Sequence, residues 1–155
     1  MTMAIPYWQR ILSIVLYMLP LSDSVQFGSS LFAQYPFLQI IFLPTIPIYL
    51  LERVMPFGSF LIFTLIFLFI TRNPKIPYFL RFNSMQAILL NISVIAISFT
   101  FQILLLPLGL NLLIRTLSST ILICILAIII FAIVECIKGK EPDLPGITTA
   151  VRMQI

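Results

Sequence analysis

A short stretch in the middle of the chain places an arginine and two carboxamides at the start of a long apolar run. The stretch extends from Arg81 to Ala87, and the apolar run continues from it to Leu106. Arginine and amide groups offer directed hydrogen-bond donors to carboxylate or carbonyl oxygens. The stretch is therefore either a docking site for a partner or a topology anchor with snorkelling cations and a capped helix start. Its candidate contact residues are Arg81, Asn83, Ser84 and Gln86.

Polar residues recur along this apolar run at a spacing that places them on one face of a helix. At roughly 100° per residue, four of them fall within about 40° of one another. They are Ser84, Asn91, Ser98 and Gln102. In a bilayer such groups need partners in protein or water. They either hydrogen-bond to a neighbouring helix or line a conduit in which a passing peptide meets uncharged polar groups.

The titratable residues exclude most enzymatic chemistry. The chain has no histidine, which removes the commonest metal ligand and general base. None of the five acidic residues lies in the middle of an apolar run, so neither paired-carboxylate chemistry nor a buried proton relay is expected. Cys124 and Cys136 are about 18 Å apart along one expected helix, which favours packing over a disulfide. We therefore expect no enzyme, no metal site and no cofactor.

The composition is that of an integral membrane protein. Hydrophobic residues make up 61% of the 155 residues and charged residues 9%, whereas soluble domains are about half apolar and about one quarter charged. The net charge of +4 comes from basic residues scattered among apolar segments. Because they form no patch interleaved with exposed aromatics, no nucleic-acid partner is expected.

The apolar segments predict an all-α fold, with four transmembrane helices in a single membrane domain over residues 1–155. At roughly 1.5 Å per residue, the longer runs cross a hydrocarbon core of about 30 Å with some tilt. From Gly139 the composition turns polar, which predicts a tail over 138–155 that leaves the membrane. The expected spans are 6–21, 56–73, 82–106 and 114–137.

The segment 31–51 is apolar enough to insert but has Pro36, Pro44 and Pro47 in its interior, which disfavours one clean helix. Counting basic residues indicates whether it crosses, because short loops rich in Lys and Arg stay on the side of synthesis. With the four spans above, all basic residues except Arg53 and Arg115 fall on one side. The sequence therefore predicts a Pro-broken re-entrant or interfacial segment on the outer side, between the first and second spans, with both termini inside.

Several strings, in order along nearly the whole chain, resemble the twenty-kilodalton subunit family of the translocon at the inner envelope membrane of chloroplasts. This family includes cyanobacterial and plastid-encoded homologues. The strongest string is Arg-Phe-Asn-Ser-Met-Gln-Ala-Ile-Leu-Leu at 81–90. The others are Tyr-Met-Leu-Pro-Leu at 17–21, Pro-Phe-Gly-Ser at 56–59, Arg-Asn-Pro-Lys at 72–75, and Glu-Pro-Asp-Leu-Pro at 141–145 with Ala-Val-Arg at 150–152.

The resemblance implies a multi-pass protein of the plastid inner envelope, or of a cyanobacterial membrane, with both termini on the stromal or cytosolic side. It implies a channel-forming or channel-associated subunit that acts in preprotein import. The partners would be other membrane subunits of a translocon, possibly a second copy of the chain, the preprotein and the lipid bilayer. The competing hypothesis is a structural or assembly subunit of a photosynthetic or respiratory complex that conducts nothing.

Overall fold

The computed structural model describes residues 4–109 and 111–155, and all regular secondary structure in these ranges is helical. This confirms the all-α prediction. Tight turns of 3-10 type cover Val25–Gly28, Pro36–Thr45 and Leu106–Leu108, and π turns cover Phe67–Thr71 and Phe101–Leu105. The α-helices are α1 (Tyr7–Ser24), α2 (Ser29–Gln34), α3 (Ile46–Val54), α4 (Gly58–Ile66), α5 (Tyr78–Thr100), α6 (Asn111–Ile137) and α7 (Ile147–Gln154).

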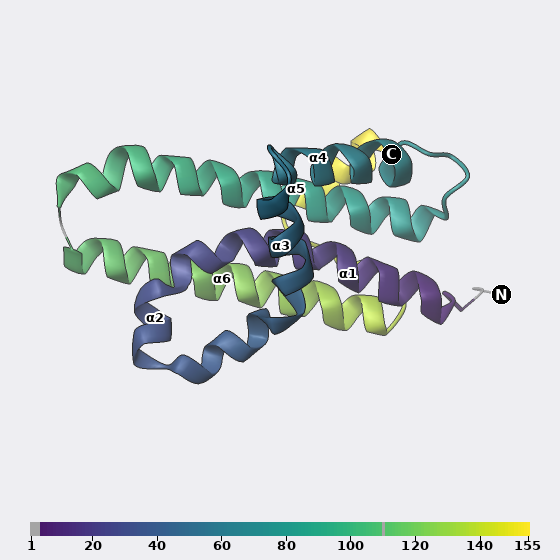
Figure 1. Cartoon of the computed structure of the whole chain (residues 1–155). Coiled ribbons are helices and arrows are strands. Elements are labelled where there is room, and N and C mark those ends of the chain that lie inside the picture. The colour runs from purple at the N-terminus through teal and green to yellow at the C-terminus, as the bar shows by residue number, and fades with distance from the viewer. Residues whose placement is uncertain (1–3, 110) are drawn as a thin grey trace.

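Three long helices form the body of the molecule (Figure 1). Helices α5 and α6 run in opposite directions, and α1 packs against both of them. The turn that leaves α5 contains Gly109 with a φ of 64°, a left-handed conformation that glycine adopts without strain. Apolar side chains from all three helices fill the space between them, including Tyr17, Val94 and Ile129.

Four helical stretches in the described residues are long and apolar enough to cross a membrane. Their number is the predicted one, but the set of segments differs. The expected span 56–73 contains only the nine residues of α4 and five more in a π turn, which together measure about 21 Å. The long stretches are Tyr7–Gln34, Pro36–Val54, Tyr78–Leu108 and Asn111–Ile137.

Proline and backbone geometry explain these differences. Pro36 and Pro47 lie in the first turn of their helical stretches, where the missing N–H breaks no helical hydrogen bond. The region 36–54 therefore stays helical, changing from 3-10 to α geometry at Ile46. Pro56 does not begin a helix, because Phe57 takes up a left-handed φ of 58° and α4 starts only at Gly58.

Helix α3 crosses the long helices instead of running alongside them (Figure 1). It contacts α1 and α4, and a Cβ at Gly58 would overlap the backbone of Glu52, so α3 and α4 meet closely. The segment between α1 and α4 thus changes direction while α3 keeps it in contact with both helices. The re-entrant or interfacial placement of 31–51 stays a prediction, as do the span boundaries.

Labelling of a cysteine at Val54 tests this placement. If 31–51 does not cross, a Val54→Cys variant is expected to react with a membrane-impermeant maleimide from the outer side, because Val54 is 79% exposed and ends α3. Leu108→Cys marks the outer side and Lys75→Cys the inner side in a background without Cys124 and Cys136. Reaction of Val54→Cys from the same side as Lys75→Cys would show that 36–54 crosses the membrane.

The tail after Ile137 folds back onto the bundle. Helix α7 packs on α5, and Thr148 and Val151 are buried in this contact. The N-terminal end of α1, the loop 72–77 and the end of α6 lie at one end of the molecule (Figure 1). The exit of the tail from the membrane stays a prediction, but its docking against α5 is a structural feature that composition did not reveal.

Candidate contact sites along helix α5

The predicted docking residues at the start of α5 are folded into the protein interior. Asn83, Ser84 and Gln86 are fully buried, and Arg81 is half-buried. Because α5 begins at Tyr78 and not at residue 82, these side chains occupy the first turns of the helix. They contact four other parts of the chain, namely α1, the end of the α4 region, α6 and the tail.

Asn83 and Gln86 meet the hydroxyl group of Tyr17 from α1. The Tyr17 hydroxyl donates to Gln86 Oε1 at 2.8 Å and lies 3.1 Å from Asn83 Oδ1. Cys136 Sγ from α6 also donates to Asn83 Oδ1 at 3.1 Å. The Asn83 amide nitrogen donates to the Phe79 carbonyl at 2.8 Å. Asn83 thereby joins α1, α5 and α6, and Cys136 is a free thiol in this contact.

The amide nitrogen of Gln86 holds the C-terminal tail. It donates to the Pro142 carbonyl at 2.8 Å and to Thr148 Oγ1 at 2.9 Å. Thr148 Oγ1 also accepts the Leu144 backbone N–H at 2.7 Å. We call Tyr17, Asn83, Gln86 and Thr148 the tail lock. It uses both ends of the Gln86 carboxamide, so the side chain is hydrogen-bonded entirely within the chain.

Arg81 and Ser84 bind the end of the α4 region. Arg81 Nε donates to the Thr71 carbonyl at 3.0 Å, and the hydroxyls of Ser84 and Thr71 lie 2.8 Å apart. The geometry of the whole stretch favours the anchoring interpretation over docking. Contact of these residues with a partner remains a prediction.

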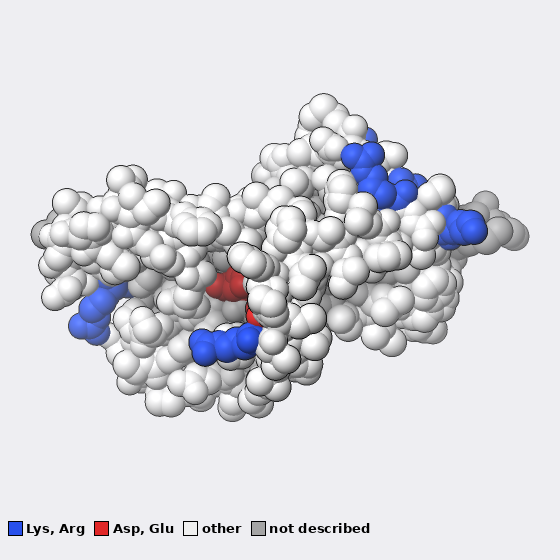
Figure 2. All heavy atoms as spheres, turned by 45° about the horizontal axis from the view of Figure 1, so that its top comes forward, with Lys and Arg blue, Asp and Glu red and all other residues white. Residues whose placement is uncertain are grey.

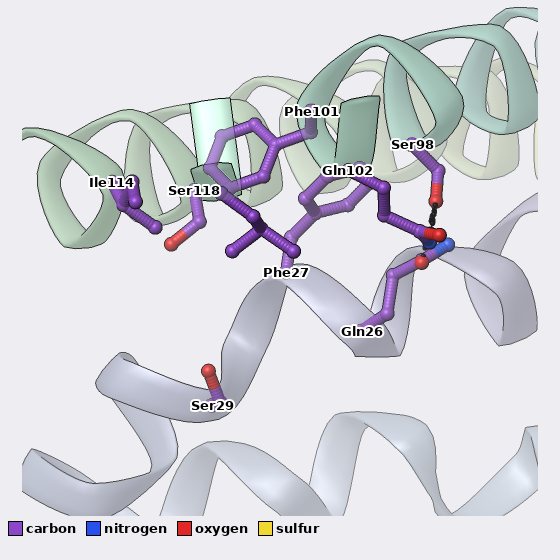
Figure 3. A pocket seen from close by; sticks show the side chains of 9 residues that line it. Gln26, Phe27, Ser29, Ser98, Phe101, Gln102, Ile114 and Ser118 are labelled. Carbon is purple, nitrogen blue, oxygen red and sulfur yellow. Dashed lines mark hydrogen bonds between the residues drawn. The ribbon is translucent and has the colours of Figure 1, made fainter. Parts of the chain in front are cut away.

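Ser98 and Gln102 lie in a groove of about 490 Å³ (Figure 3). Ser98 Oγ donates to Gln26 Oε1 at 2.6 Å, and Gln102 Nε2 lies 3.2 Å from Ser98 Oγ. The groove lies where α1 has ended, so the first turns after α1 face the end of α5 and the start of α6. Ser29 and Ser118 add hydroxyl groups, and Phe27 and Phe101 form an edge-to-face pair in its wall at a centroid distance of 5.9 Å.

Asn91 lies on α5 between the tail lock and the groove. It is 1% exposed, and its amide makes no hydrogen bond within the described residues. Its side chain lies beside Asp23, and Asp23 in turn lies near Glu52. The crossing of α3 brings Glu52 near Asp23 at the end of α1, an approach of two carboxyl groups that the sequence did not predict.

The structure thus divides the seven candidate residues among three sites. The tail lock and its neighbouring contacts take up Arg81, Asn83, Ser84 and Gln86. Asn91 lies beside the carboxyl group of Asp23. Ser98 and Gln102 line the groove. Sequence patterns did not identify Gln26, Asp23, Glu52 or Thr148 as their partners. The only available signal was at Tyr17, which begins one of the strings in the family resemblance.

Comparison with known proteins shows similarity over nearly the whole chain. Residues 2–151 match the family model described as chloroplast import apparatus Tic20-like. A Tic20 family protein of Synechocystis is 36% identical over 147 residues, covering 94% of this chain and 92% of its own length.

Plant and algal proteins show the same relationship. The protein TIC 20-v, chloroplastic, of Arabidopsis thaliana is 32% identical, covering 94% of this chain and 70% of its own length. The Tic20 family protein Ycf60 of Gracilaria tenuistipitata is also 32% identical, with coverages of 94% and 74%. Since the family model and the relatives span almost all of the helices and every candidate residue described above, this chain belongs to the Tic20 family.

Proposed function

We propose that this chain contributes the groove between the end of α5 and the start of α6 to the path of a preprotein through a membrane translocon. Membership of the Tic20 family makes the chain a non-enzymatic, multi-pass component of a protein-import translocon, in the chloroplast inner envelope or a corresponding cyanobacterial membrane. The observation that carries the proposal is the groove lined by Gln26, Ser98 and Gln102.

The chemistry of the groove suits an extended polypeptide. Its side chains offer amide and hydroxyl groups, which donate and accept hydrogen bonds without a fixed charge, and the aromatic pair Phe27 and Phe101 offers apolar contact. A passing peptide has unpaired backbone N–H and C=O groups, which need such partners inside a membrane. The groove therefore provides hydrogen bonds to the backbone while selecting weakly among side chains.

The role of the chain in conduction is passive in this proposal. One copy of a bundle of this size encloses little space, so a continuous pore requires further copies or larger subunits. Apolar side chains are exposed in the π turn after α5, such as Ile103 and Leu104, and on α6, such as Ile123, so these surfaces are free to pack against such neighbours.

Crosslinking from the groove tests this proposal. A photoreactive amino acid at Gln102, whose side chain is exposed at the groove, is expected to crosslink to a precursor arrested during import. The same probe at Ser93, which is exposed on α5 but does not line the groove, serves as the control. Crosslinks from Gln102 to a resident subunit alone would favour a structural role without conduction.

A further inference from the structure

Two carboxyl groups and a carboxamide converge near the middle of the bundle. Asp23 comes from the last turn of α1, Glu52 from the end of α3 and Asn91 from the middle of α5. Asp23 lies next to both Asn91 and Glu52. Ser22 Oγ donates to Glu52 Oε2 at 3.5 Å, and Ser59 lies beside the same carboxyl group. We call Asp23, Glu52 and Asn91 the acidic cluster.

The acidic cluster holds four buried polar atoms that make no hydrogen bond of standard geometry with the described residues. These atoms are one carboxyl oxygen each of Asp23 and Glu52, and both the oxygen and the nitrogen of the Asn91 carboxamide. Asn91 is 1% exposed. Each buried polar atom without a partner costs about 1–3 kcal/mol. Three acceptor oxygens from three helices therefore lie in one region, and the only unpaired donor there among the described residues is the Asn91 carboxamide nitrogen.

No ion pair among the described residues joins a basic side chain to Asp23 or Glu52. The ion pairs among the described residues join Lys138 to Glu135 and Arg152 to Glu141, and these four residues are far from the cluster in the sequence. Arg53 directly follows Glu52, but its guanidinium carbon lies 4.9 Å from the ring centre of Tyr49. Two neighbouring carboxylates among apolar helices are costly unless a cation lies near them.

The cluster is open to a ligand from outside the chain. Figure 2 shows acidic side chains recessed near the middle of the face drawn, with a basic side chain directly beside them and uncharged surface around the rest. Asp23 and Glu52 are both half-buried, so part of each side chain is accessible from outside the chain. Along α5 the cluster lies between the tail lock and the groove of Ser98 and Gln102.

We propose that the acidic cluster binds a cationic side chain, above all an arginine, of the polypeptide that the translocon moves; this rests on the proposed function. A guanidinium carries five N–H donors and no acceptor, which matches the three unsatisfied oxygens. Organelle-targeting segments are rich in Arg and Ser and poor in acidic residues. The described residues bring no third His, Cys, Asp or Glu to the cluster, which makes a metal ion a poorer match.

A pair of peptides tests the proposal on the full chain in lipid nanodiscs. One is a fluorescent, serine-rich, acid-free peptide of about 20 residues with two arginines. The other carries citrulline, which has the shape of arginine without its charge, at both places. Fluorescence anisotropy is expected to show about tenfold tighter binding of the arginine peptide, a difference of about 1.4 kcal/mol.

Variants then locate the binding site. The isosteric pair Asp23→Asn and Glu52→Gln is expected to remove the preference for arginine, while Asp143→Asn, which removes an exposed acid of the tail, keeps it. Thermal unfolding of each variant checks that it is folded, and the peptide comparison on the unchanged chain stands even if the double variant does not fold.

Three results would overturn the proposal: equal binding of the two peptides, no binding of either, or an arginine preference that survives in the folded double variant. The proposed function is judged separately, since crosslinking of a precursor to Gln102 does not depend on charge at Asp23 or Glu52. Crosslinking together with equal peptide binding would reject the arginine site alone.

Discussion

Replacement of Gln86 by alanine is expected to lower the free energy of unfolding by about 3 kcal/mol, because it opens a cavity and removes three buried hydrogen bonds. The Tyr17 hydroxyl loses its shorter acceptor at 2.8 Å and keeps only Asn83 Oδ1 at 3.1 Å, and the Pro142 carbonyl and Thr148 hydroxyl lose a shared donor. The tail would then be held mainly by the apolar contacts of Val151. Denaturant titration in detergent micelles measures the change.

The control for this prediction is Gln102→Ala. Gln102 has the same side chain, but it is exposed and makes one weak hydrogen bond at 3.2 Å, so a loss below about 0.5 kcal/mol is expected. Limited proteolysis gives a second reading, since residues after Lys138 should become cleavable in Gln86→Ala before the bundle unfolds. Equal stability of the two variants would show that the tail lock does not hold the tail.

A tryptophan in place of Ser29 is expected to lower the rate of import about tenfold, equivalent to about 1.4 kcal/mol of added barrier. Ser29 lines the groove from α2 and its side chain is exposed. The indole can therefore occupy the groove without displacing a packed side chain. Import into membranes that carry the variant as their only copy of this subunit measures the effect.

The matched control is Ser93→Trp. Ser93 is an exposed serine on α5, and its hydroxyl donates only to the Leu89 carbonyl of the same helix. This variant adds the same bulk outside the groove and should import at the normal rate. If both variants import normally while remaining folded, the groove is not part of the preprotein path.

The sequence predicted the helices well where apolar runs are long and uninterrupted. The expected span 114–137 and helix α6 end at the same residue, Ile137, because a run of this length without proline has no competing conformation. The proline-rich segment 31–51 is not one regular helix, as expected, since it passes from α2 through a 3-10 stretch to α3. Pro36 and Pro47 nevertheless each lie in a first turn, where helices tolerate proline, whereas Pro44 lies inside the 3-10 stretch.

The polar face of α5 shows the same contrast at the level of the site. Helical spacing alone placed Ser84, Asn91, Ser98 and Gln102 on one face, and the requirement that polar groups in a membrane find partners predicted that the face would be covered. The partners themselves could not be predicted, because a hydrogen bond such as Ser98 to Gln26 joins residues far apart in the chain. Spacing along one helix carries no information about which other helix lies opposite.

By itself the sequence determined that the chain is a helical membrane protein without enzymatic chemistry and that α5 carries its polar groups on one side. It also carried the family resemblance that the comparisons confirmed. Only the tertiary structure showed that the Arg81–Ala87 stretch holds the tail, that Ser98 and Gln102 line a groove, and that Asp23 meets Glu52. The physical reason is that periodicity is a local property, whereas the burial of a polar group depends on where α1, α3 and the tail come to rest against α5.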